Sequence, residues 1–400
     1  MKVVVSCVPQ TGHITPLLPL AEAFAANGDE VTVASGPDAE RVATSRGLRF
    51  QSVGPGYDSW FSTLRARTRG IPGDGLAPSR VEGYFLPRLF GEVGMALVVD
   101  DLLALCTEIE PRLLVFEPYS LAAPLVAAVT KIHAVLHGIG PRLDPNVLDL
   151  VTDAVSPIWR EFGLDVPASA GIYSGTVVAV CPPSLDRNPG GQDYRSLRPS
   201  ELPLSEPAPL PVSFPDPDRP LIYLTLGTFS NNALDLFRLV LRALADEPVN
   251  VIITVGSDND PSALGPTPES VHVERFIDQA LVLPYCAAAV HHAGAGTMFG
   301  ILAHGLPSVA LPQSADNFVN ASLLASAGAA KNLMPDEVTD ASVRAALRSV
   351  LEDVSYRQRA ELLAGEIRVM PSPREVASEL RSAEPVKSRN ISPGKNDGAH

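Results

Sequence analysis

The sequence has few of the features that mark secreted, metal-binding or membrane proteins. Its four cysteines, Cys7, Cys106, Cys181 and Cys286, are far apart and form no Cys-x-x-Cys or Cys/His ligand spacing. We therefore expect reduced thiols that act as small core residues in a cytoplasmic protein. No run approaches the ~18 apolar residues that a membrane span needs. The apolar run at the N-terminus is too short for a signal peptide and is interpreted as a strand.

Basic residues are also scarce. The chain has 31 lysines and arginines against 45 acidic residues, a net charge of −14, and no run rich in lysine or arginine. This balance argues against nucleic acid or an anionic membrane as the main partner, although it allows a local basic pocket for a phosphate. With 46% hydrophobic and 19% charged residues the composition is globular. Four hundred residues exceed one ordinary core, so we expect two domains of roughly 200 residues each.

Strand-like and helix-like segments alternate along the first half of the chain. Continuous apolar runs are typical of buried parallel strands, and apolar residues at helical spacing predict helices between them. The alternation predicts a doubly wound parallel sheet. The pattern fails over 54–79, where we expect a long irregular loop. The expected strands are at 3–8, 30–34, 48–53, 112–116 and 131–136.

A histidine and a carboxylate each follow one of these strands. His13 comes after the first strand, before a helix that we expect to begin at Thr15 and Pro16, and Glu117 follows strand 112–116. The carboxyl ends of parallel strands meet at the sheet edge where ligands bind, so the two side chains should lie close together. The carboxylate would then hold the imidazole in one tautomer and stabilise its charged form. The alternative is that Glu117 caps the following helix.

Aromatic residues make up only 6% of the chain, and both tryptophans fall in irregular or peripheral segments of the first half. Together with nearby aromatic side chains they are candidates for the wall of an apolar cleft that takes a flat or greasy acceptor. The alternative is that they anchor loops. The candidate acceptor-binding residues are Tyr57, Trp60, Tyr84, Phe85, Phe90 and Trp159.

A proline-dense segment, 203–220, divides the chain. Its composition predicts an extended, semi-rigid linker between a domain of residues 1–202 and a second domain of residues 221–382. The alternation of strands and helices restarts after it. The polar tail, 383–400, is expected to be disordered.

The second half contains a candidate anion-binding turn, 291–297, with the sequence His-His-Ala-Gly-Ala-Gly-Thr. It follows an apolar run and leads into a helical pattern from about Thr297, so backbone N–H groups and the positive end of a helix can meet a diphosphate. His292 can add a donor from the side. The turn is not the dinucleotide fingerprint of a dehydrogenase, because Phe299 stands where the third glycine is needed. On the turn alone, a glycine-rich core turn is the alternative interpretation.

Two motifs occur together in this chain. Residues 12–21 read Gly-His-Ile-Thr-Pro-Leu-Leu-Pro-Leu-Ala, and the 291–297 turn is followed by Leu311-Pro-Gln and Asp316-Asn317. With both motifs the chain resembles the family 1 glycosyltransferases of the GT-B fold, particularly the bacterial enzymes that attach sugars to antibiotics and other natural products. The resemblance implies two Rossmann-like, doubly wound parallel-sheet domains that face each other across a cleft. The acceptor would bind in the first domain and the nucleotide sugar in the second, with the last helix, about 355–380, crossing back to the first.

The resemblance also implies roles for individual residues. His13 matches the general base, and Glu117 falls where many members keep a supporting Asp. Phe276 would lie against the nucleobase, and Asp316 with Asn317 would bind sugar hydroxyls. The expected nucleotide-sugar site comprises Gly12, Thr228, Phe276, Ile277, His292, Gly294, Ala295, Gly296, Thr297, Asp316 and Asn317.

Three positions depart from the family pattern. Members usually have Gly at 293, and Ala293 would add a methyl group close to the phosphates. Many have Gln at 317, and the shorter Asn317 should reach fewer hydroxyls or suit a deoxysugar. Glu117 lengthens the arm that supports His13 compared with Asp.

The implied reaction is inverting transfer of a sugar, a deoxysugar among the options, from a dTDP- or UDP-sugar to a hydroxyl of a small hydrophobic natural product. No metal and no permanently bound cofactor is expected, and a homodimer is left open. The alternatives are another GT-B enzyme, such as a sugar-nucleotide epimerase or a lipid-acceptor glycosyltransferase, and a non-catalytic partner protein of the same fold.

Overall fold

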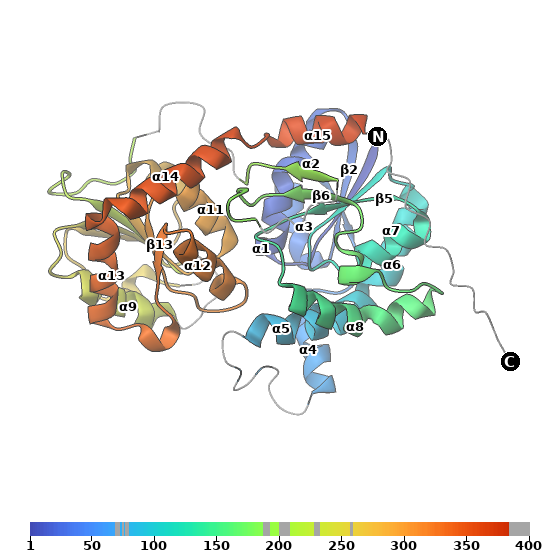
Figure 1. Ribbon diagram of the computed structural model, residues 1–400, viewed down its shortest axis with the longest axis horizontal. Helices are drawn as coiled ribbons and strands as arrows, with labels where there is room; N and C mark the ends of the chain where they lie inside the picture. The colour runs from blue at the N-terminus through green and yellow to red at the C-terminus, as the bar shows by residue number, and fades with distance from the viewer. Residues whose placement is uncertain are drawn as a thin grey trace.

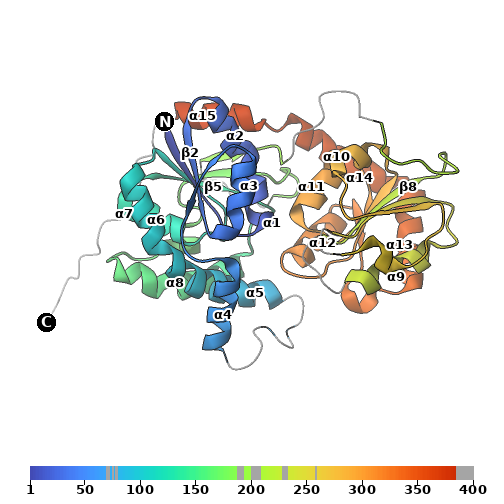
Figure 2. The ribbon, with the colours of Figure 1, turned by 180° about the vertical axis from the view of Figure 1, so that it is seen from behind.

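The computed structural model describes residues 1–68, 73, 76, 80–186, 193–199, 209–227, 233–256 and 259–383. Over these residues the chain forms two α/β lobes that lie side by side (Figures 1 and 2). The N-terminal lobe runs from blue to green in Figure 1, and the C-terminal lobe runs from yellow-green to red.

Each lobe is built on one parallel sheet. The first sheet has seven strands in the order β3-β2-β1-β4-β5-β6-β7, and the second has six in the order β10-β9-β8-β11-β12-β13. The strands of the first sheet are β1 (Lys2–Ser6), β2 (Glu30–Ser35), β3 (Arg49–Ser52), β4 (Leu113–Phe116), β5 (His133–His137), β6 (Thr176–Ala179) and β7 (Tyr194–Ser196). Those of the second are β8 (Leu221–Thr225), β9 (Asn250–Thr254), β10 (Val271–Glu274), β11 (Ala288–His291), β12 (Ser308–Ala310) and β13 (Ala330–Asn332).

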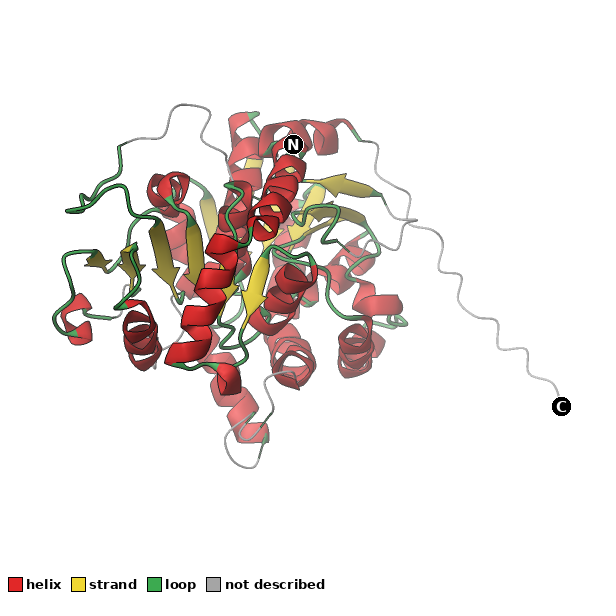
Figure 3. Cartoon of the chain, turned by 60° about the vertical axis from the view of Figure 1, so that its left-hand side comes forward, coloured by secondary structure: helices red, strands yellow, loops and turns green. Residues whose placement is uncertain are grey.

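Helices lie on both faces of each sheet (Figure 3), which confirms the predicted doubly wound architecture. In the N-terminal lobe they are α1 (Thr11–Ile14), η1 (Thr15–Leu17), α2 (Leu18–Ala26), η2 (Pro37–Ala39), α3 (Glu40–Ser45), α4 (Tyr57–Arg67), α5 (Val81–Phe85), the π-helix η4 (Leu86–Met95), α6 (Ala96–Ile109), α7 (Ala122–Thr130), α8 (Pro145–Glu161) and η5 (Ala168–Gly171). In the rest of the chain they are α9 (Ala233–Leu244), η6 (Pro261–Leu264), α10 (Gln279–Val282), η7 (Leu283–Tyr285), α11 (Ala295–Ala303), α12 (Asn317–Ser326), η8 (Pro335–Glu337), α13 (Asp340–Glu352), α14 (Val354–Val369) and α15 (Pro373–Ser382).

The central strands explain why the sheets form where the sequence predicts. β4 and β11 are buried along their whole length, as continuous apolar runs between two helical layers must be. Parallel pairing of β1 with β4 aligns Ser6 with Phe116, so the segments that follow both strands leave the sheet at the same edge. Those segments carry His13 and Glu117, and this edge becomes one side of the site.

The prediction of an irregular loop over 54–79 is wrong for its first half, because Tyr57–Arg67 forms helix α4. The Tyr57 N–H donates to Oδ2 of Asp38 at 2.7 Å, so a side chain from another segment satisfies the helix start. Trp60 and Leu64, one helical turn apart, are buried beneath η4. Glycine and arginine residues around this helix obscured its apolar stripe.

The helix after the first strand also begins earlier than predicted. Gln10 is the residue before the first helical turn, and Thr15 already has helical dihedral angles, so Thr15 does not cap the helix. His13 is therefore fixed in the one-turn helix α1 and not in an open loop.

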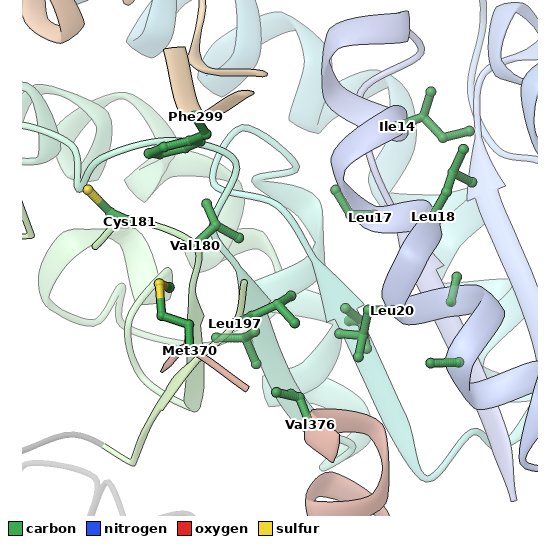
Figure 4. Packing of buried hydrophobic residues seen from close by; sticks show 14 of the residues in the cluster. Ile14, Leu17, Leu18, Leu20, Val180, Cys181, Leu197, Phe299, Met370 and Val376 are labelled. Atoms are coloured by element: carbon green, nitrogen blue, oxygen red, sulfur yellow. The ribbon is translucent and has the colours of Figure 1, made fainter. Parts of the chain in front are cut away.

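One apolar cluster continues from the first lobe into the second. It contains Leu17 of η1 and Val180 beside β6, together with Phe299 of α11 and Met370 after α14 (Figure 4). The predicted last helix is two helices, since α14 ends at Val369 and α15 begins at Pro373. Helix α15 packs on α2 of the first lobe. This shared core places α11 against the N-terminal lobe.

The predicted linker and tail lie partly outside the described residues. Residues 203–208 and 384–400 are not among them, whereas 209–220 have no regular secondary structure and contribute Leu210, Val212 and Phe214 to the core beneath β8. Within the described ranges, no helix is long and apolar enough to cross a membrane.

Candidate active site

The structure brings His13 and Glu117 together, as the sheet-edge reasoning predicts. Nδ1 of His13 lies 3.3 Å from Oε1 of Glu117, an ion-pair distance whose direction is not that of a hydrogen bond. The His13 side chain is 14% exposed and the Glu117 side chain is fully buried. The carboxylate therefore faces the imidazole from the protein side and leaves the other ring nitrogen for a substrate.

Glu117 does not cap the following helix, which was the alternative interpretation, because α7 begins at Ala122, but two other backbone N–H groups hold its carboxylate. Its Oε2 accepts the Tyr119 N–H at 2.7 Å, and its Oε1 accepts the Val8 N–H at 3.0 Å. Two backbone donors thus fix the buried carboxylate in the orientation that points Oε1 at His13.

Aromatic rings surround His13. The Tyr119 ring stands edge-on to the imidazole at a centroid distance of 5.0 Å, and the Phe90 ring lies at 6.0 Å. Tyr57 contacts Phe90 at 6.4 Å, and Phe61 contacts Tyr57 at 5.2 Å. The candidate acceptor residues Tyr84 and Phe85 of α5 continue this group, and both side chains are half-buried.

The prediction that the two tryptophans wall the cleft is wrong. Trp60 is 3% exposed and Trp159 is 2% exposed, and both belong to the core of the first lobe. Trp60 packs so closely on η4 that a Cβ atom at Gly94 would lie 2.3 Å from its ring. Trp159 packs against Gly171, where a Cβ atom would lie 3.4 Å from its ring. Large apolar rings are more stable beneath the helices than at the surface, and sequence periodicity did not show which helices cover them.

The 291–297 turn leads from β11 into α11 as predicted, although the helix begins at Ala295 and not at Thr297. Gly294 is its N-cap in an extended conformation, and among the described residues no side chain caps the helix start. A Cβ atom at Gly296 would have no described heavy atom within 4 Å. Gly12 of α1 has the same open surroundings beside His13. The first-turn N–H groups, Ala295 to Thr297, are thus available to an anion.

His292 is held between two glycines. Cβ atoms at Gly227 and Gly294 would lie 2.6 and 2.3 Å from its Nε2, so larger residues there would displace the ring. Burial lowers the pKa of His292 to about 4, against a smaller opposing effect of the Thr225 backbone. The ring is therefore neutral near pH 7. Within the part of the chain that the structure describes, its buried Nδ1 has no hydrogen-bond partner.

The preceding histidine, His291, is structural. Its Nδ1 accepts the Ala293 N–H at 3.1 Å, its Nε2 lies 3.2 Å from the Ser308 hydroxyl, and burial lowers its pKa to about 3. Ala293 itself has φ +67°, the left-handed region that favours glycine. Its methyl group is fully buried with Ala310 and Ala321. The expectation that this methyl crowds the phosphates is therefore wrong, because it points into the core.

Asp316 and Asn317 stand at the start of α12. Nδ2 of Asn320 donates both to Oδ2 of Asp316 and to the carbonyl of Ala293, each at 2.9 Å, which ties α12 to the anion-binding turn. Burial raises the pKa of Asp316, with the Asn320 hydrogen bond and the nearby His13 opposing. Asn317 is 5% exposed, and its amide interacts with the Ser314 N–H and with Asp316. Asn317 thus shapes the loop that presents Asp316.

The remaining expected nucleotide-site residues are Phe276, Ile277 and Thr228. Phe276 is 75% exposed, an unusual position for a phenylalanine, and Ile277 packs on the core beneath β8. Gln279 reaches the Thr297 hydroxyl at 3.5 Å. Thr228 lies outside the described residues.

The two halves of the site face each other between the lobes. A Cβ atom at Gly140, in the loop after β5, would lie 3.4 Å from Cβ of Ala295 and 4.0 Å from Oδ2 of Asp316. Sequence reasoning missed three residues at this junction: Tyr119, Glu82 and Asn320. Tyr119 could have been found two residues after Glu117, and Asn320 one helical turn after Asp316. Nothing in the sequence indicates Glu82, which only the fold brings to the site.

The chain is similar to known proteins over nearly its whole length. Residues 238–383 match the family described as erythromycin biosynthesis protein CIII-like, C-terminal domain. The chain is 29% identical to the L-demethylnoviosyl transferase of Streptomyces niveus, over 95% of this chain and 97% of that protein. It is 28% identical to the 3-alpha-mycarosylerythronolide B desosaminyl transferase of Saccharopolyspora erythraea, over 94% and 96%. The crystal structure of the Streptomyces sp. SF2575 glycosyltransferase SsfS6 complexed with thymidine diphosphate superimposes with a TM-score of 0.74 at 26% identity, over 96% of this chain and 100% of that one.

The two facing parallel-sheet lobes and these relatives define a glycosyltransferase of the GT-B fold. Its homologues are bacterial antibiotic glycosyltransferases, which confirms the resemblance seen in the two sequence motifs.

Proposed function

We propose that this enzyme transfers a deoxysugar from a thymidine diphosphate donor to a hydroxyl of a hydrophobic natural product, with inversion at the anomeric carbon, with His13 as general base and without a metal. The observation that carries this proposal is the pairing of the partly exposed His13 with the buried Glu117, on the opposite lobe from the anion-binding turn. The thymidine diphosphate complex of SsfS6 and the sugars named for the relatives support the donor class.

The proposed step is one direct displacement. The acceptor hydroxyl oxygen forms a bond to the anomeric carbon of the sugar while its proton passes to the free ring nitrogen of His13. The bond between that carbon and the diphosphate oxygen breaks, and its electron pair leaves with the diphosphate. Attack from the face opposite the leaving group inverts the configuration. The fixed Glu117 carboxylate stabilises the imidazolium that forms.

The donor side is suited to the charge that develops on the leaving group. The first-turn N–H groups of α11 and the positive end of its helix dipole face the place where the diphosphate would lie. His292 is neutral, so one ring N–H can donate to a phosphate oxygen without adding a charge. Donors that are already fixed in place stabilise the diphosphate without a metal in this proposal.

The exposed Phe276 supports the placement of the nucleobase. A phenylalanine that is 75% exposed offers one ring face for stacking, and its burial under a base would remove apolar surface from water. The acceptor would contact the aromatic group of Tyr57, Phe61, Tyr84, Phe85 and Phe90 beside His13.

Calorimetric titration with dTDP and UDP in the presence of EDTA tests the donor class. We expect dTDP to bind more tightly than UDP, and EDTA to change neither affinity. Transfer is then assayed by mass spectrometry with a panel of hydroxylated aromatic and macrolactone aglycones. Failure of both nucleotides to bind would exclude a nucleotide-sugar enzyme, and turnover that EDTA abolishes would exclude the metal-free mechanism.

A further inference from the structure

A small cavity of about 30 Å³ lies between the lobes, next to the proposed reaction centre. Its walls come from both lobes. Glu82 of α5, Tyr119 and the loop before α8 lie on one side, and Asp316 and Asn320 lie on the other. About 30 Å³ is enough for a water-sized group. The cavity can therefore take one small substituent of a sugar that is bound between the lobes.

The lining of this cavity is rich in hydrogen-bond acceptors. Three carboxyl groups line it, those of Glu82, Asp144 and Asp316. Asn320 is 1% exposed, and among the described residues its Oδ1 has no hydrogen-bond partner, while its amide nitrogen is used by Ala293 and Asp316. A buried acceptor without a donor costs free energy, so a ligand donor that reached this atom would stabilise the site.

The donors at the cavity are already used within the protein. The Tyr119 hydroxyl donates to Oε1 of Glu82 at 3.3 Å. The one cationic side chain in the described lining is Arg142, which stacks over the Tyr173 ring at 4.4 Å and lies 3.9 Å from Asp186. Arg142 thus interacts with a carboxylate outside the lining, and the described lining holds no second cationic side chain for its three carboxyl groups.

Glu82 shows the electrostatic cost of this arrangement. Burial, with a further contribution from Asp316, raises the pKa of Glu82 to about 7, and the Tyr119 hydrogen bond only partly opposes the rise. The pKa of Asp316 is raised as well, mainly by burial. A cation in the cavity would lower both values, because it would favour the charged carboxylates.

We propose that this cavity binds a primary ammonium group on the donor sugar, with Glu82 from the acceptor lobe and Asp316 from the donor lobe as its counter-charges and Asn320 Oδ1 as a third acceptor. The ammonium group brings three N–H donors and one positive charge, which match these acceptors. This inference rests on the proposed function, because it assigns the substituent to a sugar that spans the two lobes.

The test compares matched donors by isothermal titration calorimetry. The probes are dTDP alone, dTDP-6-deoxyglucose and the two dTDP-6-deoxyglucose derivatives in which the 3- or the 4-hydroxyl is replaced by an amino group. We expect one of the two amino sugars to bind at least ten-fold more tightly than the hydroxyl sugar at pH 7. Titrations in buffers of different ionisation heat should show release of up to about half a proton, because Glu82 with a pKa of about 7 is then half protonated. The hydroxyl sugar should release none.

Glu82→Gln separates recognition from structure. This variant should lose the preference for the amino sugar and the proton release, with the affinity for dTDP within about two-fold of wild type. Glu92→Gln is the matched control, since Glu92 is exposed on η4, and it should keep both. Equal affinity of wild type for amino and hydroxyl sugars would overturn the inference and leave the proposed function intact. A Glu82→Gln variant that weakens dTDP and every sugar equally would show a structural role instead. Absence of any dTDP binding would overturn the proposed function itself.

Discussion

One carboxylate, that of Glu117, contacts His13 at 3.3 Å while two backbone N–H groups hold it from behind. These donors, Val8 after β1 and Tyr119 after β4, come from neighbouring parallel strands. The hydrogen bonds from Val8 and Tyr119 connect the segments that follow the two strands. They also fix the orientation of the Glu117 carboxylate toward the imidazole of His13. Both the stability of this sheet edge and the proposed catalysis therefore depend on the Glu117 side chain.

Replacement of Glu117 should reduce both stability and transfer. Glu117→Ala leaves the Val8 and Tyr119 N–H groups buried without an acceptor, at a cost of about 1–3 kcal/mol for each. Glu117→Gln keeps one acceptor oxygen and should be less destabilising, but it removes the charge that stabilises the imidazolium. Urea unfolding and single-turnover transfer measure the two effects. A Glu117→Gln variant with wild-type transfer would show that Glu117 only caps the turn.

Two glycines of the anion-binding turn should respond in opposite ways. Gly294→Ala places a methyl group 2.3 Å from Nε2 of His292, so the ring must move and thermal stability should fall. At Gly296 a methyl group meets no described atom within 4 Å, and replacement of a helical glycine by alanine gains up to about 1 kcal/mol. Thermal unfolding of both variants without nucleotide makes this comparison. Equal melting temperatures would contradict the described position of His292.

Ala293 should tolerate glycine and reject valine. Ala293→Gly relieves the positive φ angle, worth about 1–2 kcal/mol, but loses a buried methyl group worth about 0.8 kcal/mol and makes the unfolded chain more flexible. The net change should therefore stay within about 1 kcal/mol. Ala293→Val adds a β-branched side chain at the same angle inside the Ala310 and Ala321 cluster, and should unfold readily. Chemical denaturation of the two variants checks the difference in sign and size.

The pH dependence of stability should report Glu82. Its pKa is raised in the folded protein from 4.5 to about 7, so the folded state binds the proton more tightly than the unfolded state. Stability from this group is then present below pH 4.5 and is lost as pH rises toward 7. Glu82→Gln removes the loss, and its stability relative to wild type should increase over this window by at most about 3 kcal/mol. A difference between the two proteins that is independent of pH would contradict the shifted pKa.

The paired motifs and the sheet edge could be predicted because they depend on local rules. Strand runs, the position of His13 and Glu117 after neighbouring strands, and the small-residue turn before α11 all follow from short-range patterns. The start of this helix is predicted five residues late, with Thr15 as the N-cap in place of Gln10, because no capping side chain marks it.

The features that could not be predicted from the sequence depend on packing between segments that are far apart in the chain. Trp60 and Trp159 are predicted to lie in the cleft because they fall in irregular or peripheral segments, whereas Trp60 is buried beneath η4 and Trp159 faces the core from α8. The direction of the Ala293 methyl depends on the backbone angle, which the sequence alone does not give. Glu82 reaches the site only because η4 and α5 fold over the sheet edge next to the second lobe.

The most direct test of the proposed mechanism is single-turnover transfer by His13→Ala with dTDP affinity measured on the same sample. Because His13 contacts the acceptor and not the diphosphate in this proposal, transfer should fall at least ~100-fold, the size of a general-base contribution. The dissociation constant for dTDP should stay within about two-fold of wild type. Transfer at the wild-type rate, or a loss of dTDP affinity equal to the loss of transfer, would contradict His13 as the base.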